Sequence, residues 1–196
     1  MTFGNGTRQY STATPANFSF FTTYVQKFAP TTSNGQFSFI NSIRDDFGGA
    51  WHTGAGDHTI DEKGYMFLVN ADYTPGQFYN TTIGNLCIGQ RYEFSVYLTN
   101  VCRNKTVCSI DPNVRFEMRT IPPGSKLLAQ YSSGSVPFNA TVMVWREYGF
   151  SFVPPTSSVV LLMISAVQGG SGNDLALDDI ALRLCSPRNM TGCPSP

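Results

Sequence analysis

Hydrophobic and polar residues alternate along much of this chain with a period of two, which is typical of β-strands. The clearest alternation lies between residues 91 and 101, and a second lies between residues 113 and 121. Because successive side chains of a strand point to opposite faces, each stretch is predicted to bury one face. The side chains expected to be buried are Tyr92, Phe94, Val96 and Leu98 in the first stretch and Val114, Phe116 and Met118 in the second.

The same pattern predicts about ten strands, separated by turns rich in Gly, Pro, Asn and Ser. No segment has a convincing helical period. This combination is typical of an all-β protein with a jelly-roll β-sandwich. The expected strands are residues 18–28, 36–43, 64–71, 77–83, 91–101, 113–121, 126–132, 145–153, 158–167 and 175–184.

The last of these strands follows a glycine-rich turn and contains two adjacent carboxylates, Asp178 and Asp179. Both of its faces are mostly apolar, with Leu175 and Leu177 on the same face as Asp179, so we predict a central strand. One of the two aspartates is expected to be buried. A buried carboxylate needs a cation, a metal ion or several hydrogen-bond donors to stay charged.

The chain has 196 residues, which is enough for one large β domain. We predict a single domain over residues 1–185, with an extended arm at 1–14 and a Pro- and Ser-rich tail at 186–196. Charged residues make up only 13% and the formal net charge is zero, so we expect no nucleic-acid partner. No run approaches the roughly 18 apolar residues of a membrane helix, so we expect no membrane insertion.

Six N-x-S/T sequons exceed what the Ser and Thr content would produce by chance, and they indicate a secreted or surface glycoprotein. The first five residues lack the basic and apolar segments of a signal peptide. We therefore interpret the sequence as a mature or excised segment. The predicted glycosylation sites are Asn5, Asn17, Asn80, Asn104, Asn139 and Asn189.

Five cysteines also fit an oxidising, extracellular compartment, and their odd number leaves one over. Cys102 and Cys108 are close in sequence and are expected to form a disulfide across a hairpin end. A bridge between Cys87 and Cys185 would tie two distant parts of the sandwich and leave Cys193 as a candidate intermolecular thiol. The alternative pairs Cys185 with Cys193 and leaves Cys87 unpaired.

Four segments, in the same order, give the chain a family resemblance. They resemble MAM domains of animal surface receptors and, more closely, the jelly-roll modules of bacterial surface adhesins that are related to carbohydrate-binding modules. The resemblance runs over nearly the whole chain and implies a galactose-binding-like jelly roll, a fold that hosts lectins, adhesion modules, enzyme appendages and spacers. The segments are Trp51, DHTIDEKGYMFLVNA at 57–71, Trp145 and GGSGNDLALDDIALRLC at 169–185.

The resemblance also implies a structural calcium ion, or another cation, between the long loop at 45–63 and the last strand. By position, its candidate ligands are Asp61, Asp178 and Asp179. Calcium takes about six to eight oxygens, which carboxylates from two distant segments and loop carbonyls supply together. Ile60 stands where the family usually has a glycine, which changes the turn. The alternative, that the two adjacent aspartates only accept hydrogen bonds from loop amides, stays open.

Catalytic constellations are weak in this sequence. The only histidines, His52 and His58, lie in one loop, and Ser171 lacks the glycine spacing of a nucleophile elbow. A glycosidase needs two acids that face a cleft, whereas Glu93 and Glu117 are predicted on the solvent faces of regular strands. We therefore predict that the protein is not an enzyme.

Sugar binding commonly uses aromatic side chains on a sheet face, because flat rings stack on sugar rings. Tyr97 falls on the polar face of its strand and Tyr148 is expected to be exposed, so both are candidate carbohydrate-binding residues. Trp51 and Trp145 are expected in the core or beneath the long loop.

These features predict an extracellular, glycosylated, non-enzymatic protein that serves as a structural or adhesive subunit. The preferred interpretation is self-association into a surface filament or matrix, through contacts of the arm at 1–14 or the tail at 186–196 with other copies. The alternative is a monomeric, calcium-stabilised carbohydrate-binding module with glycans as its partners.

Overall fold

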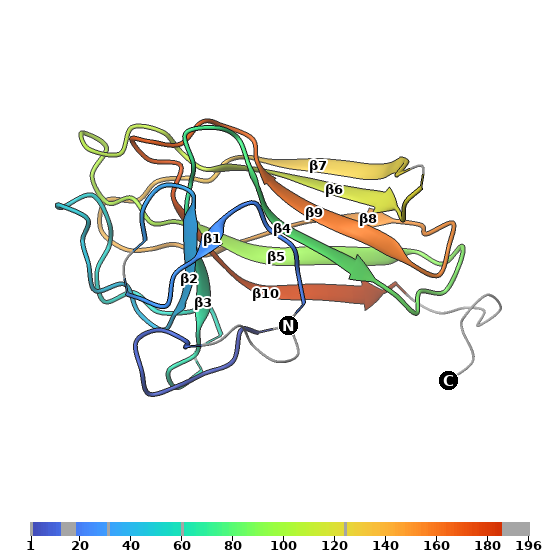
Figure 1. The fold of residues 1–196 in the computed structure, drawn as a ribbon, viewed down its shortest axis with the longest axis horizontal. Helices are drawn as coiled ribbons and strands as arrows, with labels where there is room; N and C mark the ends of the chain where they lie inside the picture. The colour runs from blue at the N-terminus through green and yellow to red at the C-terminus, as the bar shows by residue number, and fades with distance from the viewer. Residues whose placement is uncertain (1, 13–18, 31, 60, 124, 186–196) are drawn as a thin grey trace.

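Two β-sheets packed face to face form the protein (Figure 1). The computed structural model describes residues 2–12, 19–30, 32–59, 61–123 and 125–185. Within these ranges there is no helix, and hence none that is long and apolar enough to span a membrane. The predicted all-β sandwich is confirmed.

All ten predicted strands form, although the first is much shorter than expected. In chain order they are β1 Val25–Gln26, β2 Gln36–Ile40, β3 Met66–Asn70, β4 Gln77–Ile83, β5 Tyr92–Asn100, β6 Asn113–Thr120, β7 Leu127–Ser135, β8 Arg146–Phe152, β9 Val159–Ser165 and β10 Leu175–Leu184. One sheet has the order β1-β2-β3-β10-β5-β8, and the other has the order β4-β9-β6-β7. Neighbouring strands are antiparallel except β1 and β2.

Alternating side chains from both sheets fill the main core. On β5 and β6 every side chain that the alternation placed inside is buried. A second hydrophobic cluster lies on the opposite face of the six-stranded sheet, where Met66 and Ala176 pack beneath Trp51 of the long loop. The fold therefore holds this loop against the outer face of the sheet.

The central position of β10 is confirmed, because it pairs with β3 on one side and β5 on the other. Its alternation is not regular, since the register shifts between Asp178 and Ala181 and Asp179 has a φ of 52°. This bulge brings Leu177 and Ile180 to the same, interior face. The sequence reading assigned them to opposite faces, which was wrong because it assumed an unbroken period of two.

The N-terminal arm does not extend away from the domain. Phe3 is 1% exposed, and its ring lies 5.2 Å from that of Phe39 in the main core. Asn5 forms a β-bridge with Gly64, and Tyr10 forms one with Ile40. Residues 2–12 thus lie against their own sandwich. The predicted tail at 186–196 lies outside the described residues.

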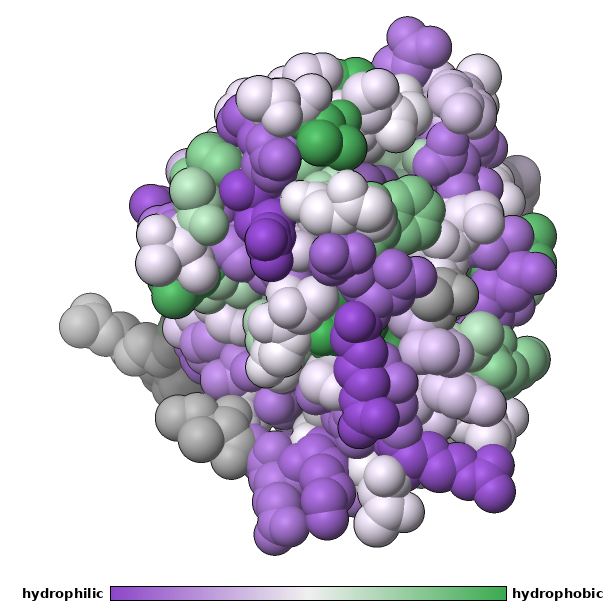
Figure 2. All heavy atoms as spheres, turned by 90° about the vertical axis from the view of Figure 1, so that its left-hand side faces the viewer, coloured by the Kyte–Doolittle hydropathy of each residue, from purple (hydrophilic) through white to green (hydrophobic). Residues whose placement is uncertain are grey.

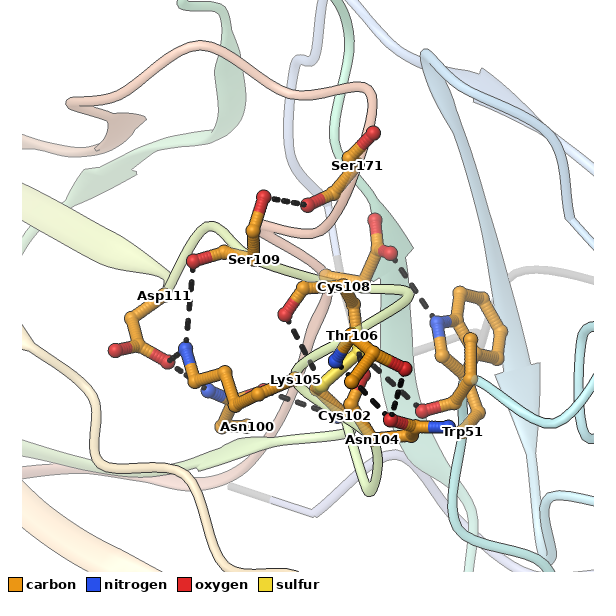
Figure 3. The surroundings of a disulfide bond; sticks show 12 residues. Trp51, Asn100, Cys102, Asn104, Lys105, Thr106, Cys108, Ser109, Asp111 and Ser171 are labelled. Atoms are coloured by element: carbon orange, nitrogen blue, oxygen red, sulfur yellow. Dashed lines mark hydrogen bonds and ion pairs between the residues drawn. A yellow bond between two sulfur atoms is a disulfide. The ribbon is translucent and has the colours of Figure 1, made fainter.

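The Cys102–Cys108 disulfide is confirmed, with 6.1 Å between the two Cα atoms (Figure 3). Cys185 carries a free thiol, so neither the expected Cys87–Cys185 bridge nor its Cys185–Cys193 alternative forms. Cys87 is disulfide-bonded, to a partner other than Cys185. Cys193, the candidate intermolecular thiol, lies outside the described residues.

Candidate functional site

The long loop is fixed to the six-stranded sheet at its middle by Trp51. Its indole Nε1 donates to Asp174 Oδ2 over 3.2 Å, and the other oxygen of Asp174 accepts from the Ala71 N–H over 3.0 Å. Burial raises the pKa of Asp174 to about 7, although these two hydrogen bonds favour the charged form. Asp174 is therefore a buried anchor for the loop, a role that its place just before β10 did not reveal.

The loop is fixed again near its end by the two adjacent aspartates of β10. The His58 N–H donates to Asp178 Oδ2 over 3.0 Å, and the Asp179 N–H donates to Asp178 Oδ1 over 2.8 Å. The Thr59 hydroxyl donates to Asp179 Oδ1 over 2.7 Å, and His58 Nδ1 lies 2.8 Å from Asp179 Oδ2. Asp178 is fully buried, as predicted for one of the pair, and burial raises its pKa to about 6. All four carboxylate oxygens thus have protein partners.

Asp57 and Asp61 complete an acidic group around this anchor. The pKa of Asp57 is raised by burial and then by repulsion from Asp61 and Asp179. These carboxylates fit a cation only in part, because Asp178 and Asp179 already accept N–H and O–H donors. In the described part of the chain, no three His, Cys, Asp or Glu side chains lie close enough to hold a metal ion. The calcium site stays a prediction.

Both tyrosines expected to bind sugar are covered. The imidazole of His58 stacks on Tyr97 with 3.5 Å between ring centroids, so the ring face that was expected to be an open platform is occupied. Tyr148 pairs in register with the fully buried Val96 and packs on the main core. It is half-buried and not exposed, because its pairing with Val96 turns the side chain toward the main core.

An open groove of about 370 Å³ lies beside His58, between the long loop and the segment before β8. Residues 52–57 form one wall, and residues 141–143 with Trp145 form the other. Trp145 is half-buried, and its ring stands at 69° to that of His58, with 6.0 Å between centroids. The lining of the groove as a whole is more polar than apolar. Pockets of roughly 300–1,000 Å³ are usual for small ligands.

The two walls of the groove are joined by a buried histidine. His52 is 6% exposed, and its Nε2 donates to the Asn139 carbonyl over 2.8 Å. The Asn139 side-chain oxygen accepts from the N–H groups of Thr141 and Val142, which gives that segment its turn. The sequence reading missed this site because its two walls are far apart in the chain. Trp145 was expected in the core or beneath the long loop, whereas it is half-buried in the wall of this groove.

The end of the sandwich that carries the long loop at 45–63 is at the left of Figure 1, and it faces the viewer in Figure 2. Its surface is mostly hydrophilic or intermediate, with small, separate hydrophobic areas (Figure 2). A larger cavity of about 500 Å³ opens elsewhere, between β4 and β10. Its two aromatic residues, Tyr79 and Phe94, are 1% and 0% exposed, so that cavity offers no open ring for stacking.

Of the predicted glycosylation sites, Asn5 and Asn139 are exposed, while Asn80 and Asn104 are half-buried. The side-chain oxygen of Asn104 accepts from the hydroxyl of Thr106 in its own sequon over 2.7 Å (Figure 3). Nothing in the described chain tests the attachment of glycans. The two sites outside the described residues are Asn17 and Asn189.

No protein-family model matches the chain, and no curated protein matches its sequence. Several solved structures have a similar fold. An arabinose-bound α-L-arabinofuranosidase has a TM-score of 0.51 and 13% sequence identity, over 92% of this chain. This chain spans only 25% of that enzyme.

Two smaller domains also match. A family 16 carbohydrate-binding module has a TM-score of 0.42 at 12% identity, over 75% of this chain and 84% of its own. The K3 cleaved adhesin domain of Lys-gingipain from Porphyromonas gingivalis has a TM-score of 0.39 at 9% identity, over 75% of this chain and 90% of its own. At such identities the likeness concerns the β-sandwich fold alone, and not the function.

Proposed function

We propose that this chain is a non-catalytic carbohydrate-binding module of an extracellular protein and that a neutral sugar binds in the groove beside Trp145. The observation that carries the proposal is the half-buried indole of Trp145 in the wall of an open, mainly polar groove. A sugar ring has apolar C–H faces and a rim of hydroxyls, so it needs a flat aromatic surface and nearby polar groups.

The groove supplies both hydrogen-bond donors and hydrogen-bond acceptors. Thr53 and Thr141 bring hydroxyls that donate or accept, and the glycine-rich stretch at 54–56 brings backbone amides and carbonyls. Asp57 is the one charged residue among those that line the groove. This lining favours a neutral sugar with several hydroxyls over an acidic sugar, which the carboxylate of Asp57 would repel.

The walls are fixed before a ligand arrives. His52 joins them through the Asn139 carbonyl, and His58 packs between Tyr97 and Trp145. Because these side chains are already ordered, binding costs less conformational entropy than it would in a mobile loop. The His58–Asp179 pair resembles the His and Asp members of a catalytic triad. Because the imidazole stacks on Tyr97 and lies beside Trp145, we interpret the pair as support for the wall of the groove.

Self-association is the second candidate function that the sequence suggested, and it now has less support. The arm at 2–12 packs on its own domain, so it does not offer a strand to another copy. The tail at 186–196, with Cys193, lies outside the described residues. Filament formation therefore stays a prediction that rests on the tail alone.

A glycan array followed by calorimetry tests the proposal. We expect the chain to bind at least one class of neutral oligosaccharide on the array, and Trp145→Ala to weaken that binding by at least about tenfold, which corresponds to about 1.4 kcal/mol. Trp145→Phe keeps a ring and should retain part of the affinity. Tyr73→Ala is the matched control, because Tyr73 is 60% exposed but does not line the groove.

Two results would contradict the proposal. One is an array on which no neutral oligosaccharide binds the folded protein. The other is binding that Trp145→Ala leaves unchanged, which would place the sugar elsewhere on the molecule.

A further inference from the structure

Phe21 is the most exposed large hydrophobic side chain in the described part of the chain, at 74%. It belongs to a short segment that lies along the free edge of β4, where its N–H donates to the Asn80 carbonyl over 2.7 Å. A phenyl ring that faces water at this position gains nothing for the fold, since burial is what makes an aromatic side chain stabilising. We therefore ask which residues beside Phe21 on the sheet could carry a group that covers its ring.

Phe21 and Asn80 face the same side of the sheet. Phe20 points inward and stacks on Tyr79 with 5.5 Å between ring centroids, so Phe21, the next residue, points outward. Tyr79 is buried, so Asn80, which follows it on β4, also points outward. Phe21 and Asn80 form an antiparallel β-bridge, and side chains so paired lie roughly 5 Å apart at Cβ.

Asn80 begins the sequon Asn80-Thr81-Thr82. We propose that Asn80 carries an N-linked glycan and that the first sugar of this glycan packs on the exposed ring of Phe21. The apolar C–H face of that sugar would cover the ring, while its hydroxyls and N-acetyl group stay in water. The inference goes beyond the proposed groove and does not depend on it, because Asn80 and Phe21 do not line that groove.

The attachment follows from ordinary transfer chemistry. The Asn80 side-chain nitrogen forms a bond to the anomeric carbon of an oligosaccharide carried by a lipid pyrophosphate donor. The bond from that carbon to the pyrophosphate oxygen breaks, the lipid pyrophosphate leaves, and the nitrogen loses one proton. The donor belongs to the secretory route that the sequons indicate.

The rest of the face offers further contacts to the glycan. In register with Asn80 lie Leu162 on β9 and then Glu117 on β6. Glu117 is 5% exposed and holds Arg119 through the guanidinium Nε, over 2.7 Å. Arg119 Nη1 also donates to the Ser125 carbonyl over 3.1 Å, and a guanidinium fixed at these two points presents its other N–H groups in a set direction, which suits the hydroxyls of a sugar.

The test uses the full chain secreted from a eukaryotic cell. Glycopeptide mass spectrometry is expected to find a glycan at Asn80. Thr82→Ala removes the sequon but keeps Asn80, and we expect it to lower the Tm by about 2–4 °C, as the loss of one such contact does in a domain of this size. Thr82→Ser retains the sequon and should keep both the glycan and the Tm.

Phe21→Ala tests whether the stabilisation by the glycan depends on the ring of Phe21. If the sugar packs on the ring, the double variant Phe21→Ala with Thr82→Ala loses no more Tm than the larger of the two single losses. Thr7→Ala, which removes the sequon of the exposed Asn5, is the matched control and should leave the Tm unchanged. An unmodified Asn80, or Tm losses that add in the double variant, would overturn the inference. Sugar binding in the groove stays unaffected in either case, so the two proposals fail separately.

Discussion

His58 Nδ1 and Asp179 Oδ2 lie 2.8 Å apart, although 121 residues separate them in the chain. This contact, with the hydroxyl of Thr59 on the other carboxylate oxygen, ties the long loop to the central strand of the six-stranded sheet. It also holds the imidazole between Tyr97 and Trp145. The geometry of the groove therefore depends on a carboxylate that does not line it.

Substitution of Asp179 separates its backbone role from its side-chain role. Its φ of 52° is in the left-handed region, which Asn tolerates and a β-branched residue does not. We expect Asp179→Asn to cost about 1 kcal/mol of unfolding free energy, and Asp179→Val to cost about 3 kcal/mol or more. Urea denaturation measures both losses. Equal losses would mean that the bulge does not constrain the residue.

Stability should fall as the pH rises from about 4 to about 8. Burial raises the pKa of Asp174 to about 7 and that of Asp178 to about 6. A carboxyl whose pKa is higher in the folded than in the unfolded protein binds more protons when folded, so its contribution to stability is largest below the unfolded pKa and declines as the pH rises through the folded pKa. The two groups together predict a decline of roughly 6 kcal/mol between pH 4 and pH 8.

Thermal unfolding from pH 4 to pH 8 checks this decline. Asp174→Asn is the companion variant, because it removes the group with the higher pKa and should flatten the profile between about pH 6 and pH 8. The baseline stability of this variant will be lower, since one of the hydrogen bonds from Ala71 and Trp51 loses its acceptor. A Tm that rises with pH over this range would show that both carboxyls ionise freely in the folded protein.

Most of the fold was predictable because hydrophobic alternation reports directly on which face of a strand is buried. It placed Phe94 and Val96 inside, and both are fully buried. The bulge was less predictable, because a residue with positive φ leaves no mark on the pattern when it is an aspartate.

The candidate site was much less predictable than the fold. Asp178 and Asp179 stood out because adjacent carboxylates are unusual in an apolar strand, and both do hold the loop. The groove depends instead on how the segment before β8 packs beside His52, which is a tertiary contact through a backbone carbonyl. No local pattern reports such a contact, and the family resemblance implied that Trp145 lies in the core or beneath the long loop.

Calcium should raise the Tm if a cation joins the acidic group at the end of the long loop. Burial and then repulsion from Asp61 and Asp179 raise the pKa of Asp57, and a bound cation would offset that repulsion. It would stabilise the folded state by about 2.7 kcal/mol at a hundredfold excess over its Kd. We expect millimolar CaCl₂ to raise the Tm above that in NaCl of equal ionic strength, and Asp61→Asn to reduce the effect. An identical Tm in both salts would mean that Asp178 and Asp179 serve only as hydrogen-bond acceptors.

Loss of the N-terminal packing should lower the unfolding free energy of the domain and should leave its oligomeric state unchanged. Phe3 is 1% exposed, and its ring lies 5.2 Å from that of Phe39 and 5.7 Å from that of Phe67. Phe3→Ala is therefore expected to cost about 3–5 kcal/mol of unfolding free energy, as for other phenylalanines in a core. Light scattering on the wild-type chain and the variant should give the same oligomeric state for the folded fractions. Fibres from the wild-type chain that Phe3→Ala dissolves, with unfolding free energy unchanged, would instead assign this segment to assembly.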